Sequence, residues 1–175
     1  MVDNQLILNF AISYLIGSIP FSVLIAKYVL KKDLRKIGSG NIGVSNAYRA
    51  GGFWFSLAVA LVDIGKGFVV VKYILPNSLG VFAVCVGQMH PVLLSFHGGK
   101  GVACYIGTLI AVKPLIGSFL ALGWLAMTKL TKTPFISSMT LLVASTFFID
   151  LDNYLFATIA LIITRHHKNI LDFLN

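Results

Sequence analysis

The chain has 175 residues, of which 57% are hydrophobic and only 11% are charged, and its mean hydropathy is +0.87. Soluble domains carry about a quarter charged residues, so a chain this apolar cannot cover itself with polar surface and lipid is its natural solvent. The formal net charge of +8 therefore does not indicate a nucleic-acid-binding protein, because basic residues of a membrane protein usually reflect topology or anionic lipid headgroups.

Long apolar runs mark the expected membrane-spanning helices, because a helix needs about 20 residues to cross the hydrocarbon core. The fourth of these runs contains Lys113-Pro114, and proline tends to end or kink a helix at the residue before it. That run is therefore either one long helix or two short ones. The runs cover residues 6–30, 53–75, 79–96, 102–127, 134–149 and 154–164.

The distribution of charge favours a broken fourth run, which gives seven spans. Short loops rich in lysine and arginine stay in the cytoplasm, and a six-span topology would put Lys129 and Lys132 on the poorly basic side. We therefore expect one all-α polytopic membrane domain over residues 1–175, with about seven transmembrane helices, the N-terminus outside and the C-terminus cytoplasmic. The basic residues on the expected cytoplasmic side are Lys27, Lys31, Lys32, Arg35, Lys36, Arg49, Lys100, Lys129, Lys132, Arg165 and Lys168.

The longest polar stretch, residues 31–52, is the first candidate site. Its centre is rich in small residues, whose backbone N–H groups can approach a ligand closely and form an anion-binding nest. Ser39, Asn41, Ser45 and Asn46 add neutral donors, and Arg49 adds a planar guanidinium suited to phosphate. The alternative is a cytoplasmic loop whose serines and asparagines cap helix ends.

A glycine-rich segment directly before an apolar run is the second candidate. Gly98, Gly99 and Gly101 surround Lys100, and such a segment before a helix N-terminus suits a phosphate, since free N–H groups and the helix dipole both favour an anion. It is not a Walker A loop, which has a longer glycine spacing and a Ser or Thr after the lysine. With seven spans it falls on the same side as residues 31–52, which strengthens both candidates.

The third candidate, residues 164–169, ends the last run and contains His166 and Asn169. His166 is a candidate base, since the unperturbed pKa of histidine lies near neutrality. Basic residues at a cytoplasmic helix end are also ordinary membrane anchors, so this segment does not indicate a site by itself.

Two ionisable residues interrupt an otherwise apolar run. Asp63 and Lys66 would each cost about 2.5–3.5 kcal/mol at the bilayer centre, and at positions i and i+3 they can pair on one helix face. They either neutralise each other within the bundle or lie nearer the cytoplasmic end and face a polar site, and we favour the second. Cys85 and Cys104 fall in apolar runs with no histidine cluster at ligand spacing, so no metal site is expected.

Taken together, these segments resemble the bacterial membrane acyltransferases that use acyl phosphate to acylate glycerol 3-phosphate. The resemblance covers nearly the whole chain in the right order, and it implies seven spans in the orientation given above, in the bacterial plasma membrane. The matching stretches are residues 17–21, 33–35, 38–43, Asn46, Arg49, residues 63–67, 91–92 and 98–103, Arg165-His166 and Asn169-Ile170.

The resemblance also implies an activity. The acyl group would pass from acyl phosphate to the 1-hydroxyl of glycerol 3-phosphate, giving lysophosphatidic acid and phosphate in the first step of phospholipid synthesis. The expected partners are these two substrates and membrane lipids, with no cofactor, no metal, and neither coenzyme A nor acyl carrier protein as donor. By resemblance, the substrate- and phosphate-binding residues are Ser39, Asn41, Ser45, Asn46, Arg49, Gly98, Gly99, Lys100, Gly101 and Asn169, with His166 as the catalytic residue.

Asp63, Lys66 and Gln88 are expected to support the site. Gln88 is a departure, because the family usually has histidine there, and it raises the alternative of a weakly active paralogue that binds lipid phosphates. The general base stays open between His166 and a phosphate oxygen of a bound substrate. A membrane transporter of phosphorylated solutes is a further alternative, although it predicts polar groups distributed along a path across the membrane.

Overall fold

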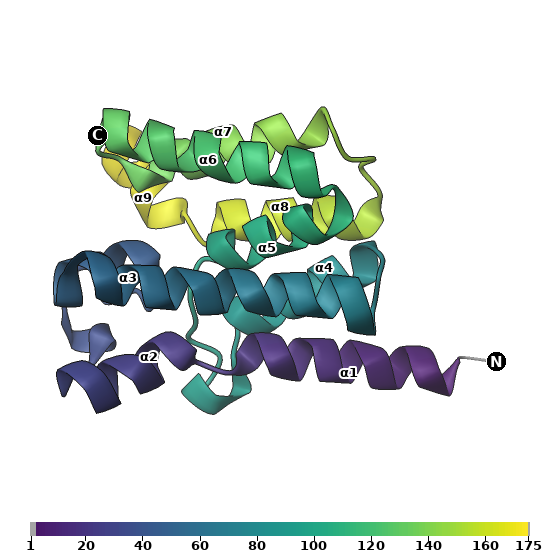
Figure 1. Cartoon of the computed structure of the whole chain (residues 1–175), viewed down its shortest axis with the longest axis horizontal. Helices are drawn as coiled ribbons and strands as arrows, with labels where there is room; N and C mark the ends of the chain where they lie inside the picture. The colour runs from purple at the N-terminus through teal and green to yellow at the C-terminus, as the bar shows by residue number, and fades with distance from the viewer. Residues whose placement is uncertain (1–2, 175) are drawn as a thin grey trace.

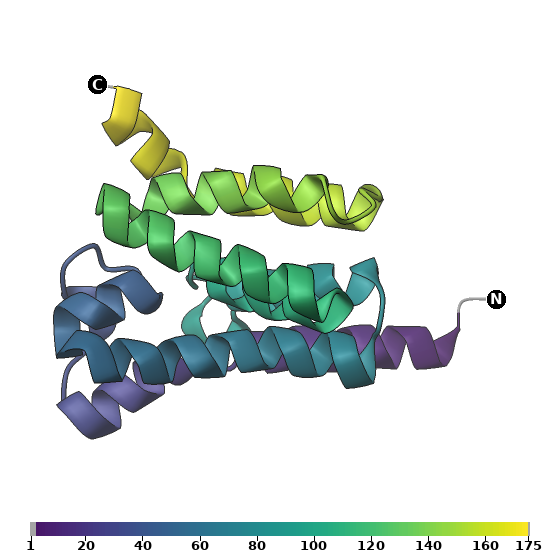
Figure 2. The same cartoon turned by 45° about the horizontal axis from the view of Figure 1, so that its top comes forward.

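A computed structural model describes residues 3–174, and every regular element in that range is a helix (Figure 1). The helices run roughly parallel to one axis of the molecule, with the N-terminus at one end and the C-terminus at the other (Figure 1). Figure 2 shows that the last helix, α9, leaves this bundle and projects away from it. The α-helices are α1 (Asn4–Ser18), α2 (Phe21–Ile25), α3 (Val44–Val69), α4 (Ser78–Met89), α5 (Val102–Val112), α6 (Pro114–Thr131), α7 (Pro134–Thr146), α8 (Asn153–Thr164) and α9 (His167–Leu174).

Within residues 3–174, three helical segments are long and apolar enough to cross a membrane, namely Asn4–Leu30, Val44–Ile74 and Pro114–Thr131. The first two include the π-helical turns η1 (Ala26–Leu30) and η3 (Val70–Ile74). Four shorter apolar helical segments accompany them, which are Ser78–Leu94, Val102–Val112, Pro134–Thr146 and Asn153–Thr164. The expected break in the fourth apolar run is confirmed, because α5 ends at Val112 and α6 begins at Pro114.

The first apolar run was expected as one helix, but the structure breaks it at Ile19-Pro20. Proline lacks the N–H that would continue the helical hydrogen bonding, and α2 starts afresh with Pro20 as its N-cap. The break frees backbone carbonyls at the end of α1. The buried Lys66 ammonium donates to two of them, Gly17 O at 3.3 Å and Ile19 O at 3.1 Å.

Two expected element boundaries are wrong. The polar stretch 31–52 was expected between helices, yet α3 already begins at Val44, because Val44 and the buried Ala47 and Ala50 form an apolar face that packs into a small core. The third run ends at Met89 instead of residue 96, since Pro91 stops α4 and a short 3₁₀ turn, η4 (Val92–Leu94), follows.

Close helix packing holds the bundle together. A Cβ added at Gly67 or Gly107 would collide with the backbone of the facing helix, so α3 and α5 approach at backbone contact. Gly17 and Gly87 allow the same approach between α1 and α4. Small residues at such contacts are typical of membrane helices, which gain van der Waals packing in place of hydrophobic burial.

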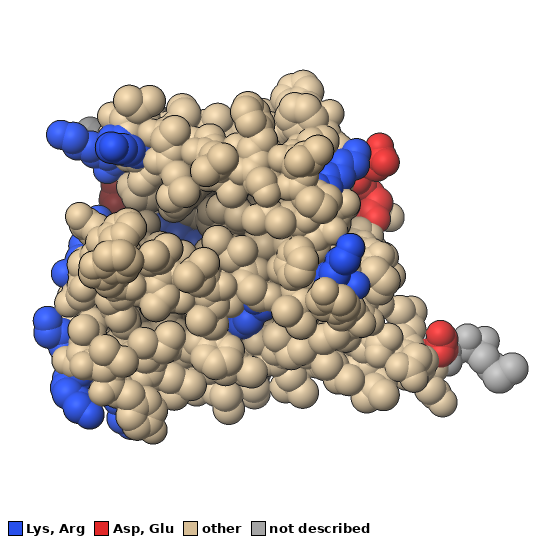
Figure 3. Space-filling view, viewed as in Figure 1, with Lys and Arg blue, Asp and Glu red and all other residues tan. Residues whose placement is uncertain are grey.

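The charged side chains separate along the bundle axis. Figure 3 shows lysines and arginines gathered mainly at the end where α9 lies, and acidic side chains, all of them aspartates, mostly at the opposite end. Because helices alternate in direction, the first end collects the start of α3, the segment before α5, the connection between α6 and α7, and the segment after α8 (Figure 1).

Candidate functional site

A cavity of about 490 Å³ lies at the basic end of the bundle and brings together all three candidate segments. Arg49 enters it from the second turn of α3, Lys100 from the segment before α5, and His166 and Asn169 from the end of α8 and from α9. Of the residues expected in the site, the cavity is lined by Ser39, Asn41, Ser45, Asn46, Arg49, Asp63, Gln88, Gly99, Lys100, Gly101, His166 and Asn169.

Lys100 connects two of the three candidate segments. Its ammonium donates to the side-chain carbonyl Oδ1 of Asn169, which joins residues 69 positions apart. Burial lowers the pKa of Lys100 from its ordinary value, and the positive charges of Arg165 and Arg49 lower it further. Three cations thus share a small volume, and a bound anion would relieve their repulsion.

His166 is buried and presents one ring nitrogen as an acceptor. Its Nδ1 lies 2.8 Å from the carbonyl oxygen of Ile162, and because a carbonyl only accepts, Nδ1 must carry the proton. The Nε2 atom therefore keeps its lone pair. Burial lowers the pKa of His166 to about 4, the hydrogen bond to Ile162 opposes this shift, and the charge of Lys100 adds to it. At neutral pH the ring is uncharged.

The glycine segment differs from the expectation in its hydrogen bonds. The N–H groups of Gly98 and Gly99 already donate to the carbonyls of Met89 and Gln88, both at 3.1 Å, so they are not free phosphate donors. The Arg165 guanidinium donates to the carbonyls of the same two glycines, at 2.8 Å to Gly98 O and 3.3 Å to Gly99 O. These bonds fold the segment tightly and fix the position of Lys100.

Gly101 retains a role at the start of α5. It has φ +83°, a left-handed conformation that favours glycine, and it caps the helix without a side-chain hydrogen bond. The next two residues, Val102 and Ala103, also line the cavity. The N–H groups of the first helical turn have no partner within their helix, so this end of α5 offers donors and a favourable dipole to an anion.

Asn46 holds the first segment in shape. It is 1% exposed, and its amide donates to the carbonyls of Leu34 at 3.0 Å and Ile37 at 2.9 Å while its Oδ1 accepts from the N–H of Ser39 at 3.2 Å. Both of its donor hydrogens are thereby used within the protein. Asn46 thus supports the loop from below, whereas the exposed Arg49, one turn later, is available to a ligand.

Asp63 and Lys66 combine the two arrangements that the sequence left open. They pair at 3.0 Å and are both almost fully buried, and Asp63 also lines the floor of the cavity. Gln88 bridges the pair, since its amide donates to Asp63 at 3.1 Å and its Oε1 accepts from Lys66. Each ion therefore has several partners. Lys66 and Gly98 do not line the cavity.

Two parts of the cavity were not expected from the sequence. One is Lys132, which was assigned only to topology; it lines the cavity from the connection between α6 and α7. The other is an apolar wall that includes Leu61, Trp124 and Leu125. Apolar periodicity gave no signal for this wall, because helices in lipid are apolar on every side.

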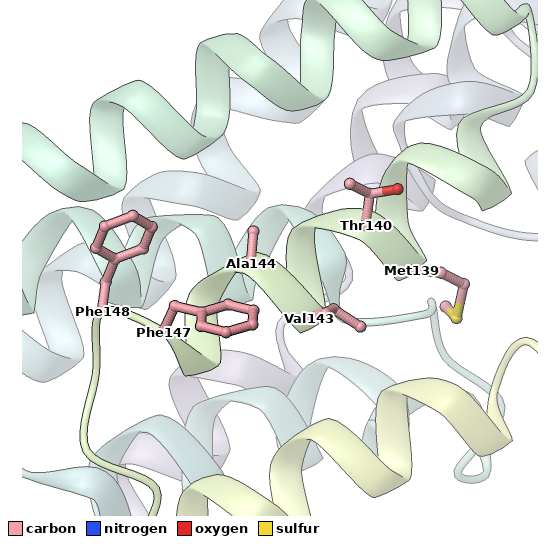
Figure 4. A pocket seen from close by; sticks show the side chains of 6 residues that line it. All are labelled: Met139, Thr140, Val143, Ala144, Phe147 and Phe148. Atoms are coloured by element: carbon pink, nitrogen blue, oxygen red, sulfur yellow. The ribbon is translucent and has the colours of Figure 1, made fainter.

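A second hollow, of about 530 Å³, lies on α7 and is lined by Met139, Thr140, Val143, Ala144, Phe147 and Phe148 (Figure 4). Its lining contains no ionisable side chain. An apolar surface on an outer helix is what lipid contact requires, so the polar cavity is the better candidate for chemistry.

Comparison with known proteins points to one family. The sequence profile described as glycerol-3-phosphate acyltransferase matches residues 7–175. A glycerol-3-phosphate acyltransferase of Cereibacter sphaeroides is 38% identical over 180 residues, covering 94% of this chain and 84% of that protein. One from Neisseria gonorrhoeae is 39% identical over 183 residues, covering 93% and 90%.

A solved structure has a similar fold. PlsY (YgiH), described as an integral membrane glycerol 3-phosphate acyltransferase in its glycerol 3-phosphate form, is 33% identical, with a TM-score of 0.84 over 96% of this chain and 91% of that one. Its lysphosphatidic acid form has a TM-score of 0.82 over the same shares.

Proposed function

The chain belongs to the glycerol-3-phosphate acyltransferase family, and on that premise we propose that it acylates glycerol 3-phosphate at its 1-hydroxyl and so makes lysophosphatidic acid. One observation carries the proposal. A single cavity joins cations from three distant segments, which suit phosphate, to an apolar wall, which suits an acyl chain.

Acyl phosphate is the donor that we propose. Both substrates then carry a phosphate group, and the cavity's Arg49 and Lys100 supply fixed positive charge. The donor is already activated, because its leaving group is inorganic phosphate. The site therefore has to orient two anionic substrates and stabilise developing charge, and orientation alone can supply several kcal/mol of the barrier.

The proposed step is a direct displacement at the acyl carbon. The glycerol hydroxyl oxygen forms the new ester bond, the bond from the acyl carbon to the phosphate oxygen breaks, and phosphate leaves with that electron pair. The hydroxyl proton passes to His166 Nε2 or to a phosphate oxygen. His166 is uncharged at neutral pH and can accept the hydroxyl's hydrogen bond. A phosphate oxygen with a second pKa near 6 is the stronger base.

We further propose one polytopic domain of seven membrane spans, with the N-terminus outside and the C-terminus in the cytoplasm. The three long and four short apolar helical segments supply the spans. Basic side chains at the cavity end support a cytoplasmic site, where glycerol 3-phosphate is available. The shortest span, Val102–Val112, covers only about 16 Å at 1.5 Å per residue, so we expect it to sit within a bundle that shields its ends.

The proposal is tested with purified protein in detergent, supplied with palmitoyl phosphate and glycerol 3-phosphate. We expect lysophosphatidic acid and inorganic phosphate in equal amounts. The same protein in liposomes distinguishes the transporter alternative. Flux of glycerol 3-phosphate without acyl transfer would contradict the enzymatic proposal, and binding of lipid phosphates with little turnover would favour the weakly active paralogue.

A further inference from the structure

The cavity contains a third cation that stands apart from the cluster around Lys100. Lys132 lines the cavity from the end of α6, where it adopts a left-handed conformation with φ +55°. Arg49 enters the same cavity from α3 and Lys100 enters it from the segment before α5. Lys132 therefore comes from a different wall of the cavity than these two cations.

The residues around Lys132 combine a cation with an apolar surface, which suits an amphiphilic ligand. On α6, Ala121, Trp124 and Leu125 precede it toward the membrane interior and line the same cavity. On the other side of the connection, Thr133 and Phe135 continue the lining at the start of α7. A ligand with an anionic head at Lys132 and an apolar tail along α6 would contact one continuous strip of the wall.

The charge of the two substrates requires more than the first cluster supplies. Two phosphate groups carry roughly −1.5 to −2 charges each near neutral pH. Arg49 and Lys100 line the cavity with two positive charges, whereas the Arg165 guanidinium does not line it and donates to the carbonyls of Gly98 and Gly99. Asp63, the acidic residue of the lining, is already paired with Lys66. Lys132 adds a third positive charge on the side where the apolar wall ends.

We infer that Lys132 binds the phosphate of the acyl donor, and that Arg49 and Lys100 bind the phosphate of glycerol 3-phosphate; this inference rests on the proposed function. Glycerol 3-phosphate is polar throughout and belongs in the polar cluster, whereas the donor is an amphiphile and belongs on the wall. When the acyl carbon–oxygen bond breaks, the leaving phosphate gains negative charge next to the Lys132 ammonium. Lys132 therefore assists both donor binding and departure of phosphate.

The test compares Lys132→Met with Lys132→Arg and with Lys129→Met, in detergent at a fixed donor mole fraction. Lys129 is an exposed lysine one turn earlier on α6 that does not line the cavity, so its variant removes the same charge from the same helix. We expect Lys132→Met to raise the donor KM at least tenfold and to leave the acceptor KM within twofold. Lys132→Arg should restore the donor KM to within threefold, and Lys129→Met should change neither.

A binding measurement that needs no turnover completes the test. Hexadecylphosphonate, a stable mimic of the donor, should bind wild type at least tenfold more tightly than Lys132→Met, as measured by isothermal titration in detergent. Equal phosphonate affinity in these two proteins, or a rise in the acceptor KM alone, would overturn the inference. If wild type binds the phosphonate through Lys132 but forms no lysophosphatidic acid, the proposed function fails while the anion site stands.

Discussion

Charged side chains are arranged in two different ways in the middle and at the start of α3. In its middle, Asp63 and Lys66 are paired with each other and bridged by Gln88, and Lys66 also caps two free carbonyls of α1. At its start, Arg49 faces a cavity with Lys100 and Lys132. Within residues 3–174, the ion pairs are Lys66 with Asp63 and Arg35 with Asp33, so none of these three cations has a carboxylate partner.

This difference indicates which charged residues stabilise the fold and which are available to bind a ligand. A buried pair with all its partners inside the protein contributes to a defined fold and has no capacity left for a ligand. Cations that lie together without a carboxylate are held in an unfavourable arrangement that a bound phosphate improves. We therefore expect substitutions in the first region to change stability and substitutions in the second to change kinetics.

Lys66→Met should have the largest effect, on stability. Removing one partner leaves the Asp63 charge buried and uncompensated, which typically costs about 3–5 kcal/mol. The measurement is thermal unfolding of purified protein in detergent. As a control, Lys36→Met removes an exposed lysine and should change little. Equal unfolding temperatures for the two variants would show that the buried pair does not stabilise the fold.

If His166 is the base that accepts the hydroxyl proton, His166→Gln should abolish most turnover while the protein keeps its fold. Loss of a positioned acid–base group lowers turnover by about 10²–10⁴-fold, and Gln can retain a hydrogen bond to the Ile162 carbonyl. Single-turnover rates and equilibrium binding of glycerol 3-phosphate provide the two readouts. Binding should survive, and a turnover within threefold of wild type would exclude His166 and leave a phosphate oxygen as the base.

Arg49→Ala should raise the KM for glycerol 3-phosphate by about 10–100-fold, because a charge-assisted hydrogen bond is worth about 1.5–3 kcal/mol. The unfolding temperature should stay near the wild-type value, since Arg49 is exposed. Lys27→Ala, an exposed basic residue outside the cavity, is the matched control for net charge. A change of the same size in that control would mean that the general positive potential, and not this site, recruits the substrate.

The free energy of unfolding should depend on pH because the imidazole of His166 is buried and uncharged in the folded protein. The pKa of His166 is about 4 in the folded protein, against about 6.5 for an unfolded histidine. The unfolded state therefore binds more protons between these values, and stability is lost as pH falls from 6.5 to 4, by about 2 kcal/mol. The measurement is the unfolding free energy of wild type and of His166→Gln across this pH range. Wild type should lose more stability than the variant as the pH falls. Equal losses would show that the His166 ring is already charged in the folded protein at pH 6.

Gln88→His should have the smallest effect and should leave activity within about threefold of wild type or raise it. A neutral imidazole has one donor and one acceptor, so it can in principle replace both the bond to Asp63 and the bond from Lys66. Steady-state rates with both substrates test this. A loss above tenfold would show that the surrounding groups have adapted to the shape of the glutamine amide.

Several features of the fold follow from local chemistry and were predictable. The break between α5 and α6 was predicted because proline lacks the N–H that continues a helix, and it is confirmed. The ion pair between Asp63 and Lys66 was predicted because residues three apart lie on one face of a helix, and it is confirmed too. The convergence of residues 49, 100 and 166 on one cavity was expected from topology, because alternating spans bring every second connection to the same side.

Other features depend on contacts between distant segments. The N–H groups of Gly98 and Gly99 donate to backbone carbonyls at the end of α4. The Asn46 amide donates to backbone carbonyls of the loop before α3. These groups therefore support the shape of the site and are not free to bind a ligand. In the sequence, Lys132 has the pattern of a basic residue that anchors a helix end at the membrane surface. Only the packing of α6 and α7 against the cavity distinguishes it from Lys129, three residues earlier.

The apolar wall has a consequence for how the reaction is supplied. Leu61 and Leu125 line the cavity and are 62% and 57% exposed, so the apolar wall is accessible from outside the bundle. An amphiphilic substrate can then enter by lateral diffusion, and its effective concentration is its density per unit area of bilayer. Diluting the donor with inert lipid should slow the enzyme even when the bulk amount of donor is unchanged.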